Sequence, residues 1–222
     1  MARPELWLCR HGETEWSRDG RHTSRTDLPL TPAGVDEARR LVALLAGVDF
    51  DLVLTSPLRR ATDTAELLGF PDARREPALA EWHYGDYEGM TTPEIRETVP
   101  GWTVWTHESP GGESAGQVAA RADRVIERVL DEATGRALVV SHGHFLRVLA
   151  ARWIGQSAAF GGHLLLGTAT VSVLGWERDT RSVARWNAPA GDPGGGPAAR
   201  AAVEPAAARG DESGSGVDAA RP

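Results

Sequence analysis

Histidine and arginine side chains follow three apolar segments of the chain, at the points where strands are expected to end. They are Arg10 and His11 after Glu5–Cys9, Arg59 and Arg60 after Asp51–Thr55, and His142 and His144 after Ala137–Ser141. Because the carboxyl ends of parallel strands meet at one edge of a sheet, we expect two of the histidines and several of the arginines to form one cationic pocket. Arginine binds a phosphate dianion through its planar fork, and histidine can donate a proton or attack. The pattern therefore predicts a phosphate site.

Four short apolar runs predict the strands that position these residues. They are Glu5–Cys9, Asp51–Thr55, Ala137–Ser141 and Thr170–Leu174, and Arg181–Trp186 is expected to add an edge strand. The first three runs are almost continuously apolar, which is typical of strands with both sheet faces covered.

Amphipathic segments between these runs predict four helices. A first begins at Thr31-Pro32 and ends at Gly47, and a second is expected to begin at Ser56-Pro57, because a hydroxyl N-cap before proline marks a helix start. Two more are centred on Val118–Val129 and Leu146–Trp153. Strands that alternate with helices in this way predict an α/β layered fold with a mostly parallel sheet.

Composition excludes several other classes of protein. The 222 residues carry 24 basic and 31 acidic side chains, a net charge of −7 that argues against nucleic-acid binding. Every basic residue is arginine, which excludes a lysine Schiff base and a P-loop lysine. Cys9 is the only cysteine, so neither an internal disulfide nor a cysteine-based zinc site can form, and in its apolar strand it is expected to be a small buried side chain.

No apolar run is long enough to cross a membrane, and the first residues do not resemble a signal peptide. We therefore expect a cytoplasmic protein without a membrane partner. Residues 188–222 are rich in Ala, Gly and Pro and predict a disordered tail, which leaves 1–187 as one catalytic domain.

Five motifs occur in a fixed order along the predicted domain. They are RHGETEW at Arg10–Trp16, SPLRRATDTA at Ser56–Ala65, EWHYGDYEG at Glu81–Gly89, GGES at Gly111–Ser114 and VSHGHFLR at Val140–Arg147. This ordered set resembles the histidine phosphatase superfamily, the phosphoglycerate-mutase-like clan. It is most similar to the small branch that holds acid phosphatases and sedoheptulose-bisphosphatase-like enzymes. The resemblance implies a three-layer α/β/α sandwich and covers nearly all of the predicted domain.

The resemblance also implies a role for each matching residue. His11 would be the nucleophile that becomes a phosphohistidine, and Glu81 would protonate the leaving oxygen and then activate water. Arg10, Arg60 and His142 would clamp the phosphoryl oxygens. Secondary contacts to phosphate or substrate would come from Ser17, Thr23, Tyr84 and the Gly143 N–H.

Physical chemistry is consistent with these roles. Neutral imidazole is a good nucleophile, and flanking arginines disfavour its protonation. No step requires a metal or another cofactor, although His142 and His144 could suggest a metal pair. Glu81 competes for the acid role with Glu76, Asp86 and Glu88, whereas Glu13 is expected to orient His11 or to hold its loop. Arg59 is expected to form a surface salt bridge. Trp82, Trp102 and Trp105 either cap the substrate or pack in the core.

The function that these observations favour is a phosphomonoesterase of acid-phosphatase type, acting on small phosphate monoesters such as sugar phosphates. A cofactor-dependent phosphoglycerate mutase is the first alternative. Such mutases carry arginine where this chain has Trp82, together with a longer basic insertion, whereas Met90–Gly111 is short and holds a single arginine, Arg96. A non-catalytic module that binds phosphorylated ligands is the second alternative, although it would need no general acid at Glu81. A homodimer stays open, since the clan often dimerises and the sequence shows no symmetric patch.

Overall fold

A computed structural model describes residues 3–191 of the chain. Over these residues a six-stranded sheet has the strand order β3-β2-β4-β1-β5-β6. Its strands are β1 Glu5–Arg10, β2 Leu52–Thr55, β3 Arg74–Arg75, β4 Arg136–Ser141, β5 Thr170–Glu177 and β6 Thr180–Pro189. The α-helices are α1 Glu15–Arg18, α2 Pro32–Leu45, α3 Arg59–Leu67, α4 Thr92–Thr98, α5 Ala115–Glu132 and α6 Gly143–Trp153. Short 3₁₀ helices are η1 Pro77–Leu79, η2 Gly85–Tyr87 and η3 Ala158–His163.

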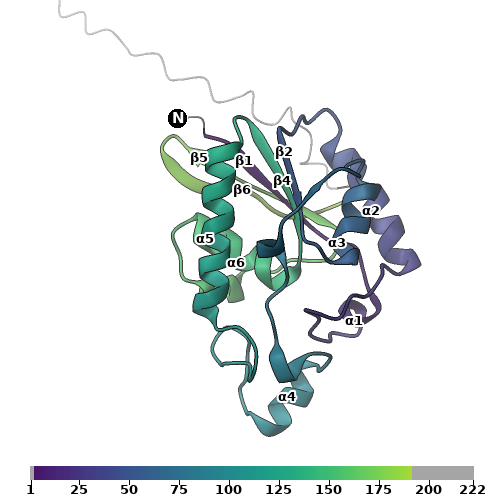
Figure 1. Cartoon of the computed structure of the whole chain (residues 1–222), viewed down its shortest axis with the longest axis vertical. Helices are drawn as coiled ribbons and strands as arrows, with labels where there is room; N and C mark the ends of the chain where they lie inside the picture. The colour runs from purple at the N-terminus through teal and green to yellow at the C-terminus, as the bar shows by residue number, and fades with distance from the viewer. Residues whose placement is uncertain (1–2, 192–222) are drawn as a thin grey trace, which may run out of the picture.

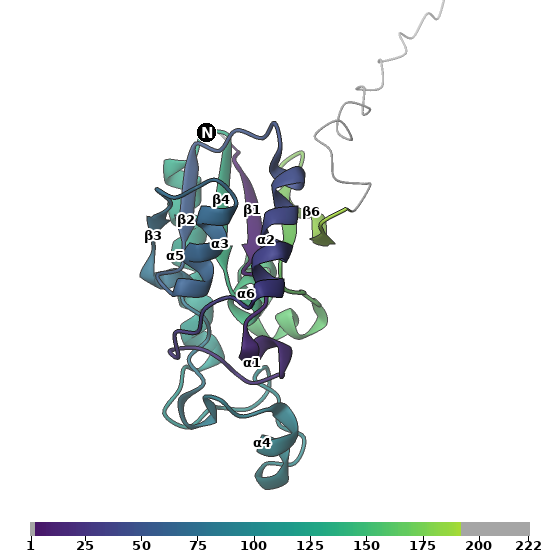
Figure 2. The same ribbon diagram turned by 90° about the vertical axis from the view of Figure 1, so that its right-hand side faces the viewer.

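The sheet lies between two layers of helices. Helices α5 and α6 cover one face, and α2 and α3 cover the other (Figures 1 and 2). Strands β3, β2, β4 and β1 pair in parallel, whereas β5 pairs antiparallel with β1 and β6 antiparallel with β5. The predicted three-layer α/β/α fold with a mostly parallel sheet is confirmed.

Alternation along the central strands explains why they are apolar throughout. In β1, Leu6 and Leu8 join the core beneath α5 and α6, whereas Trp7 and Cys9 join the core beneath α2 and α3. A strand with both faces buried needs an apolar residue at every position. Cys9 is fully buried, as expected, and burial raises the pKa of its thiol to about 12.

Three of the four predicted helix patterns correspond closely to helices in the structure, and the start of α3 differs. The Thr31 side chain accepts a hydrogen bond from the Gly34 N–H and caps α2, as predicted. The predicted start of the next helix at Ser56-Pro57 is wrong. Helix α3 begins at Arg59, and its N-cap residue Leu58 makes no side-chain cap bond. The Ser56 hydroxyl bonds His142 at 2.7 Å and also accepts from the Leu58 N–H at 3.4 Å, before the helix begins.

The folded part extends past the expected boundary at residue 188. The predicted edge strand is β6, which runs to Pro189, and Ala188 in it is buried. Most of the predicted tail lies outside the described residues.

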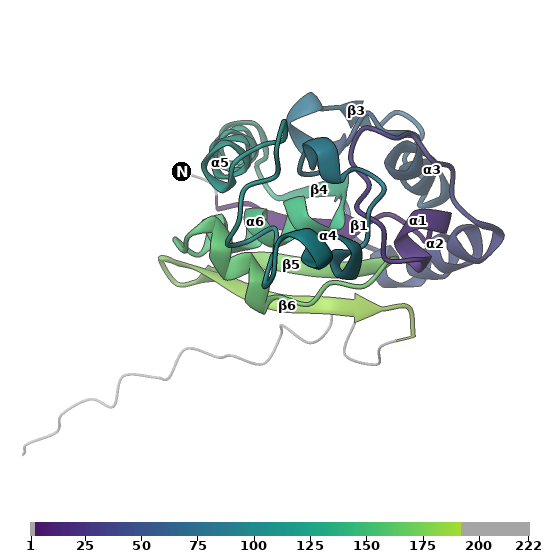
Figure 3. The same cartoon turned by 90° about the horizontal axis from the view of Figure 1, so that it is seen from below.

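The segment between η1 and α5 extends beyond the carboxyl edge of the parallel strands and carries α4 (Figures 1 and 3). Trp82 and Trp102 in this segment are almost fully buried and belong to the core beneath α5 and α6, and Trp105 packs against that core. None of the helices that the structure describes is long and apolar enough to cross a membrane.

Candidate active site

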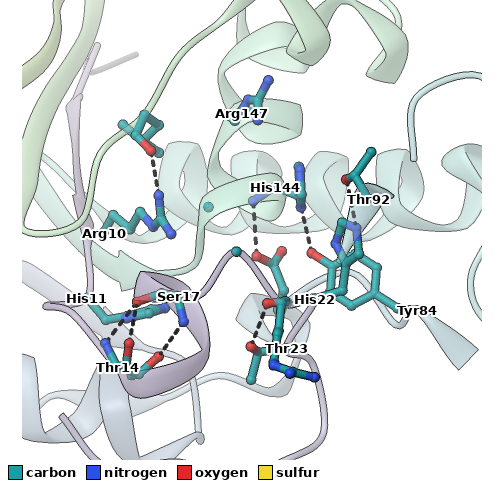
Figure 4. Close-up of a pocket in the computed structure, with 15 residues that line it drawn as sticks. Arg10, His11, Thr14, Ser17, His22, Thr23, Tyr84, Thr92, His144 and Arg147 are labelled. Atoms are coloured by element: carbon teal, nitrogen blue, oxygen red, sulfur yellow. Dashed lines mark hydrogen bonds between the residues drawn. The ribbon is translucent and has the colours of Figure 1, made fainter. Parts of the chain in front are cut away.

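A cavity of about 260 Å³ opens at the carboxyl edge of the sheet, where β1 and β4 lie side by side. Its walls come from the loops after β1, the segment after η1, helix α4, the start of α6 and the loop before β5 (Figure 4). Seven of the residues predicted from sequence line it. They are Arg10, His11, Ser17, Thr23, Glu81, Tyr84 and Gly143. Glu81 is the one carboxylate among the lining residues, so the walls are cationic or neutral elsewhere.

His11 is held as a neutral imidazole with one nitrogen left for reaction. Its Nδ1 lies 2.7 Å from the Gly12 carbonyl oxygen, which can only accept, so Nδ1 carries the proton and Nε2 keeps its lone pair. Burial lowers the pKa of His11 well below 6.5, and the charges of Arg60 and Arg10 lower it further. The sequence predicted the effect of the arginines, but burial is the larger cause.

Gly12 lets the chain after β1 approach helix α2 closely enough to fix this geometry. A Cβ built on Gly12 would lie 2.3 Å from the carbonyl oxygen of Gly34, inside α2. The Gly12 N–H donates to the Thr64 hydroxyl of α3 at 3.2 Å. Glu13 accepts a hydrogen bond from the Thr31 hydroxyl at 2.8 Å, so it holds the loop, one of the two roles expected for it.

The partly buried Arg10 guanidinium lies in the wall of the cavity. One end donates to the carbonyl oxygen of Leu166 (Figure 4). Its Nε is one of two buried side-chain polar atoms, among the residues described, that have no hydrogen-bond partner. A buried guanidinium N–H without an acceptor is costly, and a phosphoryl oxygen would satisfy it.

His142 and Arg60 lie behind His11 and are not among the residues that line the cavity. The rings of His11 and His142 are 5.1 Å apart between centroids. The Arg60 Nε donates to Nδ1 of His142 at 3.2 Å, so neutral His142 carries its proton on Nε2 and donates it to Ser56 at 2.7 Å. Burial and the Arg60 charge lower the pKa of His142 well below 6.5.

The remaining Arg60 donors bind backbone oxygens. Nη1 donates to the Thr26 carbonyl, and Nη2 donates to the carbonyls of Thr23 and Ser24, at 3.1–3.2 Å. Of the three residues predicted to clamp the phosphoryl group, only Arg10 lines the cavity. Arg60 and His142 lie next to the cavity, joined to each other, with the His142 ring against that of His11. Arg59 forms the exposed ion pair with Asp63 that the sequence predicted.

Glu81 is fixed at the amino end of α6. Its Oε1 accepts the N–H groups of Trp82 and Phe145, both at 2.8 Å, and its Oε2 accepts the His144 N–H at 3.0 Å. Three backbone donors leave the carboxylate little freedom to rotate. The competing carboxylates Glu76, Asp86 and Glu88 do not line the cavity.

Of the other predicted residues that line the cavity, Ser17, Thr23 and Tyr84 already have hydrogen-bond partners for their hydroxyl groups. Ser17 and Thr14 cap helix α1 through reciprocal hydrogen bonds, and the Thr23 hydroxyl donates to the Arg21 carbonyl. The Tyr84 hydroxyl lies 2.6 Å from Nδ1 of His144 (Figure 4). Gly143 is the first residue of α6, and a Cβ on it would lie 3.2 Å from the Arg10 guanidinium carbon.

Sequence reasoning missed most of the wall opposite His11, although it had singled out His144. The wall is formed largely by Arg21, His22, Thr92, His144 and Arg147, with Leu166 near Arg10. The Thr92 hydroxyl lies 3.3 Å from Nε2 of His22, and Arg147 donates to the carbonyls of Gly161 and Gly162 and stacks on Trp105. Trp82, Trp102 and Trp105 do not line the cavity, so core packing, one of the two alternatives, describes them. Arg147 and His144 stood in one of the five motifs.

Known proteins share both this sequence pattern and this fold. Residues 6–189 match the model of the histidine phosphatase superfamily, branch 1. An acid phosphatase from Mycobacterium tuberculosis is 44% identical over 182 residues, which cover 81% of this chain and 90% of that protein. The sedoheptulose 1,7-bisphosphatase of Saccharomyces cerevisiae is 35% identical over 184 residues, 68% of each chain. A solved structure of an M. tuberculosis open reading frame product has a TM-score of 0.80 and 42% identity, and covers 84% of this chain and 98% of that one.

Proposed function

Because this chain belongs to the histidine phosphatase superfamily, we propose that it is a metal-independent phosphomonoesterase that forms a phosphohistidine on His11. The observation that carries the proposal is the state of His11. Its Nδ1 proton is engaged by the Gly12 carbonyl, its pKa is lowered by burial and by two arginines, and it lines the cavity beside the unpartnered Nε of Arg10. A neutral, oriented imidazole beside a cation is what in-line attack on a phosphate dianion requires.

The first step transfers the phosphoryl group to the enzyme. Nε2 of His11 attacks phosphorus, and the bond from phosphorus to the ester oxygen breaks. Glu81 in its acid form gives its proton to that oxygen, so an alcohol leaves. Arg10 and the Gly143 N–H, the first of α6, stabilise the charge on the phosphoryl oxygens, since a helix amino terminus favours anions.

The second step returns the free enzyme. The Glu81 carboxylate takes a proton from water, the water oxygen attacks phosphorus, and the bond to Nε2 breaks to release inorganic phosphate. We assign Arg60 and His142 a supporting part in both steps. Their hydrogen bonds fix the ring beside His11, and the Arg60 charge disfavours a protonated nucleophile.

The residues of the wall opposite His11 favour small polyhydroxy phosphate esters, such as sugar phosphates, as substrates. His22, Thr92 and Arg147 offer polar groups there, and the buried tryptophans offer no aromatic face to the cavity. A hydroxyl-rich leaving group can exchange hydrogen bonds with such a wall, whereas an aromatic alcohol cannot.

A phosphoglycerate mutase remains the alternative function. It must hold a second anionic group while the intermediate reorients. Arg96, the one arginine of Met90–Gly111, does not line the cavity and donates instead to the Trp102 carbonyl. The wall opposite His11 holds two arginines, Arg21 and Arg147, which could bind a second phosphate group. Bisphosphates are therefore included among the substrates to be tested.

The test measures p-nitrophenyl phosphate hydrolysis in excess EDTA for the wild type and for His11→Ala. Activity that survives EDTA and is lost in the variant supports the proposal.

A panel of sugar phosphates, sugar bisphosphates and phosphoglycerates then ranks substrates by kcat/KM. Mutase turnover that exceeds phosphate release would overturn the choice of phosphatase. Binding without turnover on the whole panel would favour the non-catalytic module. The cytoplasmic location, the homodimer and the lack of a nucleic-acid partner stay predictions.

A further inference from the structure

Glu88 lies outside the cavity and binds a loop rather than a cation. Its two carboxylate oxygens accept the N–H groups of Ser24 and Thr26 at 2.9–3.0 Å, and also the Ser24 hydroxyl. No arginine forms an ion pair with it among the described residues. Burial opposes ionisation of this half-buried carboxyl, but these hydrogen bonds outweigh it and hold its pKa below the usual 4.5.

The loop that Glu88 binds is the same loop that binds Arg60. The Ser24 and Thr26 N–H groups point to Glu88, while the carbonyls of Thr23, Ser24 and Thr26 accept from Arg60. The loop thus presents donors to a carboxylate and acceptors to a buried guanidinium. Its position is set by both partners, because buried polar groups on each side need their hydrogen bonds.

Arg60 passes this constraint to the reaction centre. Its Nε donates to His142, whose other nitrogen donates to Ser56, and its charge is the second-largest cause of the lowered pKa of His11. A shift of Arg60 would free the His142 ring and change the charge close to the nucleophile.

We propose that Glu88 is a positioning residue for phosphoryl transfer, acting through the Thr23–Thr26 loop on Arg60 and His142. The inference rests on the function proposed above for His11 and adds a residue that does not touch substrate. A carboxylate suits the task because three donors converge on two oxygens. A glutamine would present its NH₂ group to one of those donors.

Glu88→Gln tests the inference, with Glu94→Gln as the matched control. Glu94 also accepts an N–H group and a hydroxyl from a threonine, Thr91, but that contact caps α4 and does not lead to Arg60. Ser24→Ala is a milder second variant, since it removes the hydroxyl donor and keeps both N–H groups.

The first readout needs no catalysis. Nε2–H of His142 is buried and bonded to Ser56, so it should give a protected imidazole proton resonance, assigned by its loss in Ser56→Ala. We expect its exchange with solvent to quicken at least about tenfold in Glu88→Gln, less in Ser24→Ala, and not in Glu94→Gln. Exchange that is unchanged in Glu88→Gln would overturn the inference.

The second readout is a double-mutant cycle on kcat/KM. Glu88→Gln should lower kcat/KM by between about 2-fold and 100-fold in the wild-type background, and by less than twofold where Arg60→Met is already present. A carboxylate that merely stabilises the fold would cost the same factor in both backgrounds, which would sink the inference. A wild type without phosphatase activity would contradict the proposed function instead, and proton exchange would still decide on Glu88.

Discussion

Replacing Glu81 by glutamine should slow the hydrolysis of phosphate esters with poor leaving groups far more than that of esters with good leaving groups. Oε1 accepts two N–H groups, and Oε2 accepts one, so Oε2 is the oxygen with capacity to carry the catalytic proton. Glutamine has no proton to give at that position. General-acid help is typically worth about 10²–10⁴-fold, or about 3–5 kcal/mol, and this is the loss expected for an alkyl phosphate such as a sugar phosphate.

The p-nitrophenolate of an aryl ester such as p-nitrophenyl phosphate leaves readily without protonation. For this ester, kcat/KM should therefore fall by less than about tenfold. The assay compares kcat/KM of wild type and Glu81→Gln over a series of phosphate esters with graded leaving groups. The plot of rate against leaving-group acidity should steepen in the variant. In the folded state, the glutamine NH₂ would face the His144 N–H, and one lost hydrogen bond should cost about 1–3 kcal/mol of unfolding free energy.

Glu76→Gln is the matched control for this prediction. Glu76 has the same small exposed fraction as Glu81, 8%, and it also accepts a backbone N–H, from Ala78. It lies outside the cavity, so its replacement should lower stability without changing the preference among leaving groups. Equal losses for alkyl and aryl esters in Glu81→Gln would refute the assignment of Glu81 as general acid.

Three further predictions concern the loop after β1 and the far wall. Burial lowers the pKa of His22 from 6.5 to about 4, so the folded state binds fewer protons than the unfolded state below pH 6.5. The free energy of unfolding should therefore decrease as the pH is lowered, and this group should account for about 2 kcal/mol of the decrease between pH 7 and pH 5. Urea titrations should show that His22→Gln removes this part of the pH dependence. Gly12→Ala should cost about 1–3 kcal/mol or more by urea denaturation and reduce activity, because the new Cβ would meet the Gly34 carbonyl at 2.3 Å; an active variant of unchanged stability would contradict this. The Thr92 hydroxyl lies in the cavity wall, 3.3 Å from His22. Thr92→Val should therefore lower kcat/KM for sugar phosphates by about 2–13-fold, because one neutral hydrogen bond to a substrate hydroxyl is lost, and leave kcat/KM for p-nitrophenyl phosphate nearly unchanged. Equal losses for both substrates would show that the wall opposite His11 does not bind substrate hydroxyl groups.

The sequence predicted the elements that carry the site because local signals there agree with the fold. Continuous apolar runs marked β1, β2 and β4, and the residues that follow them hold His11, Arg60 and His142. The two-residue strand β3 was missed, since two exposed arginines have no apolar pattern. The start of α3 at Arg59 was misplaced by the Ser56-Pro57 signal, and the bond from the Ser56 hydroxyl to His142, 86 residues away, leaves no local trace in the sequence.

The far wall of the cavity could not be read from the sequence for the same reason. His22, Thr92 and Arg147 come from three separate segments and meet only through the fold. The division between Arg10 and Arg60 was also beyond sequence reasoning. Both arginines stand in motifs, but only the structure shows that backbone carbonyls occupy the Arg60 donors while the Arg10 Nε stays unpartnered.

Trapping the covalent intermediate tests the central claim most directly. The enzyme is mixed with radiolabelled p-nitrophenyl phosphate in EDTA, quenched in alkali within milliseconds, and digested for mass spectrometry. We predict label on the peptide that holds His11, stable in alkali and lost in acid, formed at least as fast as steady-state turnover and absent from His11→Ala. Turnover without any labelled protein, or label on another residue, would contradict the assignment of His11 as the nucleophile.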